Sequence, residues 1–143
     1  MKKLFVDTGA WLALNNKKDK YHIDAVKANK DFLDKGYFYV SSDYILDETY
    51  TLLRYDVGHK RAVEFGGEIK SLQEMGKIRI VHINQDILGK AWEVFEKYSD
   101  KDFSFTDCTS FAVIEMLGIN EAFSFDRHFE QYGFIRLPIL PSL

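Results

Sequence analysis

The chain has 143 residues, of which 46% are hydrophobic and 29% charged, and it contains a single cysteine, Cys108. This length and composition predict one globular domain over residues 1–143, and the lone cysteine excludes an internal disulfide and a zinc site built on several thiolates. With 19 basic and 22 acidic side chains the net charge is −3, which excludes proteins that bind nucleic acid through bulk positive charge. Because Asp7 breaks the apolar N-terminal stretch, we expect neither a signal peptide nor a membrane span, and a reducing cytoplasm is the expected compartment.

Short apolar runs alternate with longer amphipathic stretches along the chain. The runs expected to form strands are residues 4–6, 37–40, 78–83, 122–125 and 134–137. The stretches expected to form helices are residues 8–14, 22–35, 43–55, 60–73, 85–98, 104–117 and 127–132. Strands and helices that alternate at this spacing are typical of βαβ units. The expected fold is therefore a three-layer α/β/α sandwich around a parallel sheet of about five strands, with ligands at the carboxyl ends of the strands.

Two aspartates follow predicted strands directly. Asp7 comes after the first apolar run, and Asp126 comes after the run that ends at Phe125. An aspartate in this position often caps the next helix, and for either residue alone a cap and a functional site are about equally good interpretations. Because parallel strands end at one edge of a sheet, two such acids on that edge favour a site.

Two further acids lie on predicted helices. Glu48 borders the apolar arc of the helix over residues 43–55, whereas Asp47 faces the opposite side, so Glu48 is expected to point toward the sheet or its rim. A glutamate there can also extend into solvent or pair with a lysine. Asp107 fits a capping box with Ser104, which is the better interpretation of that motif alone. The rest of that helix is apolar nearly all round, however, so its polar first turn indicates a pocket at this end.

Carboxylates that converge without histidine or cysteine partners repel one another, and this repulsion raises their pKa values. A divalent cation relieves the repulsion, and ligands that are all oxygen suit Mg²⁺ or Mn²⁺. Such an ion can activate water, bind a phosphate oxygen and neutralise developing charge. The matching reaction is hydrolysis of a phosphodiester.

Four stretches of the chain carry a resemblance to a known family. They are Phe5–Trp11, Tyr44–Leu53, Ser104–Phe111, and Ala122–Phe129 followed by Gly133 and Phe134. In this order and spacing they resemble the PIN-domain ribonucleases, in particular the VapC-type toxins of toxin–antitoxin systems. The resemblance implies a PIN-like fold and a Mg²⁺- or Mn²⁺-dependent endoribonuclease that leaves 5′-phosphate and 3′-hydroxyl ends. It also implies an RNA substrate, a cognate antitoxin protein and a homodimer.

The resemblance assigns roles to individual residues. The acidic quartet of the family falls on residues that would be both catalytic and metal-binding, namely Asp7, Glu48, Asp107 and Asp126. Its small hydroxyl residues fall on Thr8 and Thr106, which would orient the acids or the substrate. We expect three of the acids to hold one metal ion and Asp126 to complete a second metal site.

Substrate contacts are expected from two groups of side chains. Arg127 and His128 follow Asp126 directly, and Lys17, Lys18 and Lys20 follow the first helix. All of these side chains can bind phosphates, although a solvated charged surface is the better interpretation of the lysines.

Two other functions remain as alternatives. The turn from Asp7 to Ala10 also resembles the catalytic turn of an aspartic protease, but that fold is nearly all β-sheet, whereas helical periods dominate this chain. A PIN fold could also serve in RNA processing, or bind RNA without a toxin role.

Overall fold

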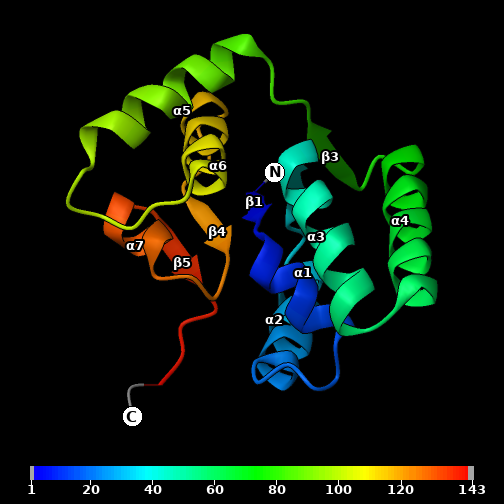
Figure 1. Ribbon diagram of the computed structural model, residues 1–143. Helices are drawn as coiled ribbons and strands as arrows, with labels where there is room; N and C mark the ends of the chain where they lie inside the picture. Colours follow the sequence, from blue (N-terminus) through cyan, green and yellow to red (C-terminus); the bar gives the residue numbers. More distant parts are fainter. Residues whose placement is uncertain (1, 142–143) are drawn as a thin grey trace.

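The computed structural model describes residues 2–141, which form a five-stranded, all-parallel sheet with helices on both sides (Figure 1). The strands are β1 (Lys3–Val6), β2 (Phe38–Ser42), β3 (Ile78–Val81), β4 (Glu121–Phe123) and β5 (Ile135–Leu137). The helices are α1 (Thr8–Asn15), α2 (His22–Asp34), α3 (Asp43–Asp56), α4 (His59–Glu74), α5 (Gln85–Lys97), α6 (Phe105–Met116) and α7 (His128–Tyr132). The predicted α/β/α architecture is confirmed.

The order of the strands across the sheet is β3-β2-β1-β4-β5. From β1 the chain moves outward through β2 to β3, and it then returns to add β4 and β5 on the other side of β1. The direction of winding therefore reverses between β1 and β4, where Val6 pairs with Phe123. A reversal of this kind opens a crevice at the carboxyl ends of the two strands, where open α/β sheets bind their ligands.

The helices form two groups, as right-handed crossovers on either side of the reversal require. Helices α1 to α4 contact one another, and so do α5 to α7. In Figure 1 these groups lie on opposite sides of the molecule, with β1 and β4 between them. Helix α6 is central, because every residue from Asp107 to Ile114 is buried. Among residues 2–141, no helix is both long and apolar enough to cross a membrane.

Local sequence signals explain where several helices begin and end. The Ser42 side chain accepts a hydrogen bond from the backbone of Ile45 at the start of α3, and Ser104 forms the predicted capping box with Asp107 at the start of α6. Gly118, with φ of 64°, follows the last turn of α6 in a backbone conformation that other residues rarely adopt. The capping box lies where the sequence predicted it, and the helix boundaries agree with the prediction to within about two residues.

Three strands differ from the prediction at their carboxyl ends. Strand β3 ends at Val81, two residues before the predicted end at residue 83. Strand β2 continues through Ser41 and Ser42, because Ser41 is buried and its hydroxyl donates a hydrogen bond to the carbonyl of Val6 on β1. Strand β4 ends at Phe123, so Ser124 and Phe125 separate it from Asp126. The prediction that Asp126 follows the strand directly is therefore wrong by two residues.

Candidate active site

A cavity of about 860 Å³ opens at the carboxyl ends of β1 and β4. The four acids singled out in the sequence all line it: Asp7, Glu48, Asp107 and Asp126. Asp7 follows β1, Asp126 follows the turn after β4, Asp107 lies in the first turn of α6, and Glu48 lies on α3. The four connections between successive strands thus each bring one of these side chains to the same crevice.

Asp7 sits at the N-cap position of α1, but its side chain makes no capping hydrogen bond. Its Oδ2 atom instead accepts a hydrogen bond of 3.0 Å from the hydroxyl of Ser124, and that hydroxyl accepts one of 3.0 Å from the backbone N–H of Asp126. The Asp7 side chain is buried, with 7% exposed. Asp7 therefore occupies the cap position without capping the helix, and it turns its carboxylate toward the β4 side of the crevice.

Asp107 serves both interpretations that the sequence left open. Its Oδ2 atom accepts the backbone N–H of Ser104 at 3.0 Å, which completes the capping box. The same oxygen lies 2.7 Å from Nδ1 of His128. The cap therefore fixes the carboxylate at the cavity wall, and it leaves the other oxygen without a side-chain donor among residues 2–141.

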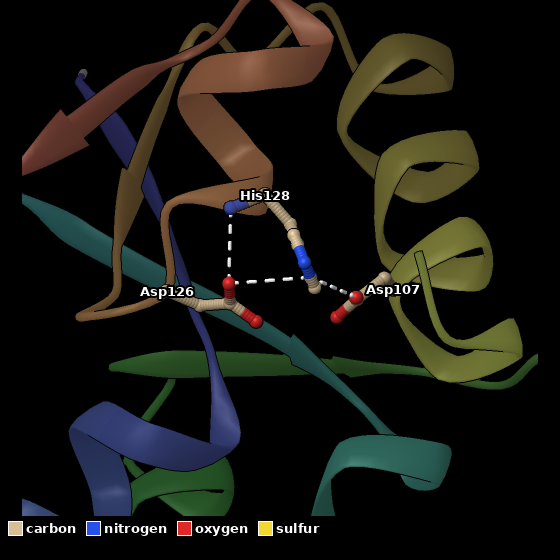
Figure 2. Close-up of side chains that lie close together, drawn as sticks. All are labelled: Asp107, Asp126 and His128. Carbon is tan, nitrogen blue, oxygen red and sulfur yellow. Dashed lines mark hydrogen bonds and ion pairs between the residues drawn. The ribbon is translucent and has the colours of Figure 1, made fainter. Parts of the chain in front are cut away.

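Asp126 and His128 complete a compact cluster with Asp107 (Figure 2). The backbone N–H of His128 donates to Oδ1 of Asp126 at 2.9 Å, and the ring Nδ1 lies 3.2 Å from the same oxygen. One possible ligand atom from each of the three residues lies within 4.8 Å of the others. Figure 2 shows the imidazole ring reaching between the two carboxylates.

The electrostatics of the cavity favour a cation. The pKa of Asp7 is raised from 3.8 to about 7, chiefly by burial and in addition by the charge of Asp107, while the hydrogen bond from Ser124 opposes the shift. Burial likewise raises the pKa of Asp107, with the charge of Asp126 adding to the shift and hydrogen bonds from Ser104 and His128 opposing it. The chain therefore compensates the negative charge of these carboxylates only in part. A divalent cation with oxygen ligands would neutralise the remainder.

Thr8 gives a second reason to expect a ligand. Its Oγ1 atom is buried at the cavity, and it has no hydrogen-bond partner among the described residues. A buried hydroxyl left unpaired costs about 1–3 kcal/mol, so a polar ligand that accepts its hydrogen would recover free energy. Thr106 differs from Thr8, because it lines a neighbouring cavity together with Glu48.

Glu48 reaches the cavity from α3 as an exposed side chain. The sequence predicted that it faces the sheet or its rim, and the structure places it at the exposed rim. Asp47, its neighbour on α3, is exposed and does not line this cavity, as predicted.

Basic and aromatic side chains form the outer part of the cavity. Lys20 and Arg127 line it, whereas Lys17 and Lys18 are exposed and lie outside its lining. The rings of Tyr21 and Phe125 stack at the same cavity, with centroids 4.5 Å apart and planes 4° apart. The Lys20 ammonium lies 4.9 Å from the centroid of the Tyr21 ring.

Ser124 is the site residue that the sequence analysis missed. Its hydroxyl joins Asp7 of β1 to Asp126 in the turn after β4. A local signal for it exists, because a serine two residues before an aspartate often accepts the backbone N–H of that aspartate. Its bond to Asp7 spans 117 residues of sequence and becomes visible only in the fold.

Comparisons with known proteins identify the family of the chain. Residues 4–135 match the family model of the PIN domain. The 23S rRNA-specific endonuclease VapC20 of Mycobacterium tuberculosis is 34% identical over 134 residues, which cover 94% of this chain and 97% of that protein. The VapC ribonuclease of Archaeoglobus fulgidus is 31% identical over 127 residues, covering 87% of this chain and 77% of that protein.

Solved structures extend the comparison. The crystal structure of M. tuberculosis VapC20, described as a toxin that cleaves the sarcin–ricin loop, superposes with a TM-score of 0.79 at 33% identity and covers 92% of this chain and 96% of that one. FitAcB from Neisseria gonorrhoeae has a TM-score of 0.68 at 11% identity, covers 94% and 96% of the two chains, and shows likeness of fold alone. The match over residues 4–135 and the full-length relatives place this chain in the PIN-domain family.

Proposed function

We propose that this protein is a divalent-metal-dependent endoribonuclease and the toxin of a toxin–antitoxin pair. The observation that carries the proposal is the convergence of Asp7, Glu48, Asp107 and Asp126 on one cavity at the reversal of the sheet. Relatives that cover nearly the whole chain and are named as endonucleases or ribonucleases support it.

The donor set fits Mg²⁺ or Mn²⁺, with Asp7, Asp107 and Asp126 as the residues that would hold the ion and Glu48 as a further ligand at the open side. Each of the three aspartates uses one oxygen to accept hydrogen bonds from the chain. For Asp7 the donor is Ser124, for Asp107 the donors are Ser104 and His128, and for Asp126 the donor is His128. The other oxygen of each has no side-chain donor among residues 2–141, which leaves it free for a cation. When bound, a divalent ion supplies Lewis acidity and neutralises charge on the phosphate.

The residues around the acids would bind and orient the RNA. Lys20 and Arg127 can hold backbone phosphates on the outer part of the cavity, since a purely acidic cavity would repel the nucleic acid. The stacked pair of Tyr21 and Phe125 offers a flat aromatic surface for a base. The unpaired hydroxyl of Thr8 can donate to a phosphate oxygen or to a water molecule. Roles for Lys17, Lys18 and Thr106 remain predictions from the sequence.

The first substrate to test is 23S rRNA, because the relative that shares 34% identity over nearly the full chain is named for that RNA. The purified protein, freed of metal with EDTA, should not cleave rRNA, and added Mn²⁺ or Mg²⁺ should restore cleavage to 5′-phosphate and 3′-hydroxyl ends. A protein that binds rRNA equally well with and without metal but never cleaves it would replace the proposal with the RNA-binding alternative.

We also propose an antitoxin partner and a homodimer. A short reading frame next to this gene that encodes a protein which co-purifies with the chain and inhibits it would support the toxin role. For the dimer, the support is an exposed aromatic cluster in which Phe95 of α5 contacts both Trp92 and Phe105, with Trp92 55% and Phe95 43% exposed. Light scattering should give twice the monomer mass, and Trp92→Asp should reduce it to that of a monomer.

A further inference from the structure

The side chain of His128 contributes to the site in a way that the acidic quartet does not explain. Its ring Nδ1 lies 2.7 Å from Oδ2 of Asp107 and 3.2 Å from Oδ1 of Asp126. Because both neighbours are carboxylate oxygens, Nδ1 carries the hydrogen and donates it to the nearer one, Oδ2 of Asp107, while its charge interaction reaches Asp126. Asp107 and Asp126 come from different elements, the first turn of α6 and the turn before α7, and this side chain joins them.

The ring of His128 is also held in place by an aromatic contact. It packs edge-to-face on Phe103, with centroids 5.4 Å apart and planes at 78°, and Phe103 is buried against Phe111 of α6. The side chain is 25% exposed, so solvent reaches it only in part. The aromatic packing and the two carboxylates together fix the orientation of the imidazole, as in metal sites whose ligands are themselves held by hydrogen bonds.

Without this donor, two neighbouring carboxylates would face each other with only backbone N–H groups to hold them. Their mutual repulsion would then favour arrangements in which they lie farther apart. With it, Oδ2 of Asp107 is bonded to the imidazole, while Oδ1 of Asp126 accepts the backbone N–H of His128 and lies beside the same ring nitrogen.

We propose that His128 is a positioning residue that sets the separation of Asp107 and Asp126, so that the cavity binds a divalent cation in a preformed geometry. The inference rests on the proposed metal-dependent function, and it differs from the sequence prediction that His128 contacts the substrate. His128 acts through the two aspartates, and its hydrogen bonds, rather than the nitrogen as a ligand, account for its effect on the metal.

The test compares two variants of His128 in calorimetric titrations of the metal-free protein with Mn²⁺. His128→Leu keeps an apolar contact with Phe103 but has no donor, and it should weaken Mn²⁺ binding by about 10–100-fold, the usual effect of losing a hydrogen-bond partner of a ligand. His128→Asn carries an N–H donor close to the position of Nδ1, and it should restore the affinity to within about fivefold of the original protein. Gln131→Ala, which changes an exposed residue of the same helix and cavity, is the matched control and should leave the affinity unchanged.

A second measurement separates positioning from direct ligation. Pulsed electron paramagnetic resonance of the Mn²⁺-loaded original protein should lack the ¹⁴N coupling of a directly bound imidazole, and the activity lost in His128→Leu should recover at saturating Mn²⁺. If circular dichroism shows that the His128→Leu protein is not folded, His128→Ala replaces it as the variant without a donor.

Three results overturn the inference. Equal Mn²⁺ affinity in the original protein and the Leu variant removes the positioning role and leaves the proposed function intact. A strong ¹⁴N coupling, together with a Mn²⁺ affinity of His128→Asn as low as that of His128→Leu, would show that His128 binds the metal directly. Absence of Mn²⁺ binding by the original protein overturns the proposed function itself, and the inference falls with it.

Discussion

The two sides of the cavity hold their side chains in different ways. The buried wall, formed by Asp7, Thr8 and Asp107, lies within the core, and its aspartates accept hydrogen bonds from Ser124, Ser104 and His128. The exposed rim, formed by Lys20, Glu48 and Arg127, makes no side-chain hydrogen bond or ion pair with the rest of residues 2–141. The buried wall is therefore preorganised for a small cation, whereas the exposed rim is free to adjust to a flexible polyanion.

The largest expected effect follows from Asp7→Asn or Asp107→Asn on the buried wall. Either change removes a negative charge from the cation site while keeping the shape and an acceptor oxygen for Ser124 or Ser104. Cleavage of rRNA should fall by at least about 10²–10³-fold, comparable to the loss of one preorganised electrostatic contact in other enzymes. Initial rates at saturating Mn²⁺ measure the effect, and circular dichroism checks the fold. Near-normal cleavage by the Asp7→Asn protein would show that the buried wall is not catalytic.

The second prediction concerns the stability of the metal-free protein. Between pH 4 and about pH 7 the folded state holds a proton on Asp7 that the unfolded state has lost, because the pKa rises from 3.8 to about 7 on folding. The free energy of unfolding should therefore fall as the pH rises through this window, by up to roughly 4 kcal/mol from this group.

Urea denaturation in EDTA at several pH values between 4 and 8 measures this slope. The Asp7→Asn protein should lack this part of the slope, so the difference between the two proteins isolates the group. Mn²⁺ should stabilise the original protein more at pH 8 than at pH 5, because the cation competes with the proton for Asp7. Parallel pH profiles for the two proteins would contradict the raised pKa.

The exposed rim offers an intermediate effect through Glu48→Gln. Because this carboxylate is exposed and is not held by the chain, its loss should reduce cleavage by about 10–100-fold, less than a change on the buried wall. Asp47→Asn, one residue away on α3 and outside the cavity, is the matched control and should be neutral. If Glu48→Gln proves as damaging as Asp7→Asn, the contrast between wall and rim fails.

The smallest expected effects lie in RNA binding. Lys20→Ala and Arg127→Ala should each weaken binding of an rRNA fragment several-fold. The plot of log affinity against log salt concentration has a negative slope, and each change should make that slope shallower by about 0.7 if one phosphate contact is lost. Lys17→Ala, outside the cavity lining, should leave that slope unchanged. Fluorescence anisotropy in the absence of metal, at several salt concentrations, measures these changes. If Lys17→Ala reduced the affinity for RNA more than Lys20→Ala does, the RNA would not bind along this rim.

Much of the fold was open to prediction because local rules and global topology agree. The serine caps at Ser42 and Ser104 and the apolar run at β1 each determine their element over a few neighbouring residues. The end of β4 was not predictable in this way, because Ser124 leaves the strand to bond with Asp7, a residue 117 positions earlier.

The acids of the candidate site were also predictable, but their environments were not. The positions of Asp7 and Asp126 after apolar runs suffice to place them on one edge of a parallel sheet. The exposure of Glu48, however, depends on how far α3 extends beyond the sheet, and the contact of His128 with Asp107 depends on the packing of α7 against α6. Helical periodicity describes one helix at a time, so it predicts neither the exposure of Glu48 nor the contact of His128 with Asp107.

The most direct test of the central claim is a crystal structure of the protein soaked in Mn²⁺, with an anomalous difference map recorded at the manganese absorption edge. The account predicts a peak in the cavity, at bonding distance from oxygen atoms of at least two of Asp7, Asp107 and Asp126. A protein saturated with Mn²⁺ that shows no peak among these three carboxylates would contradict it.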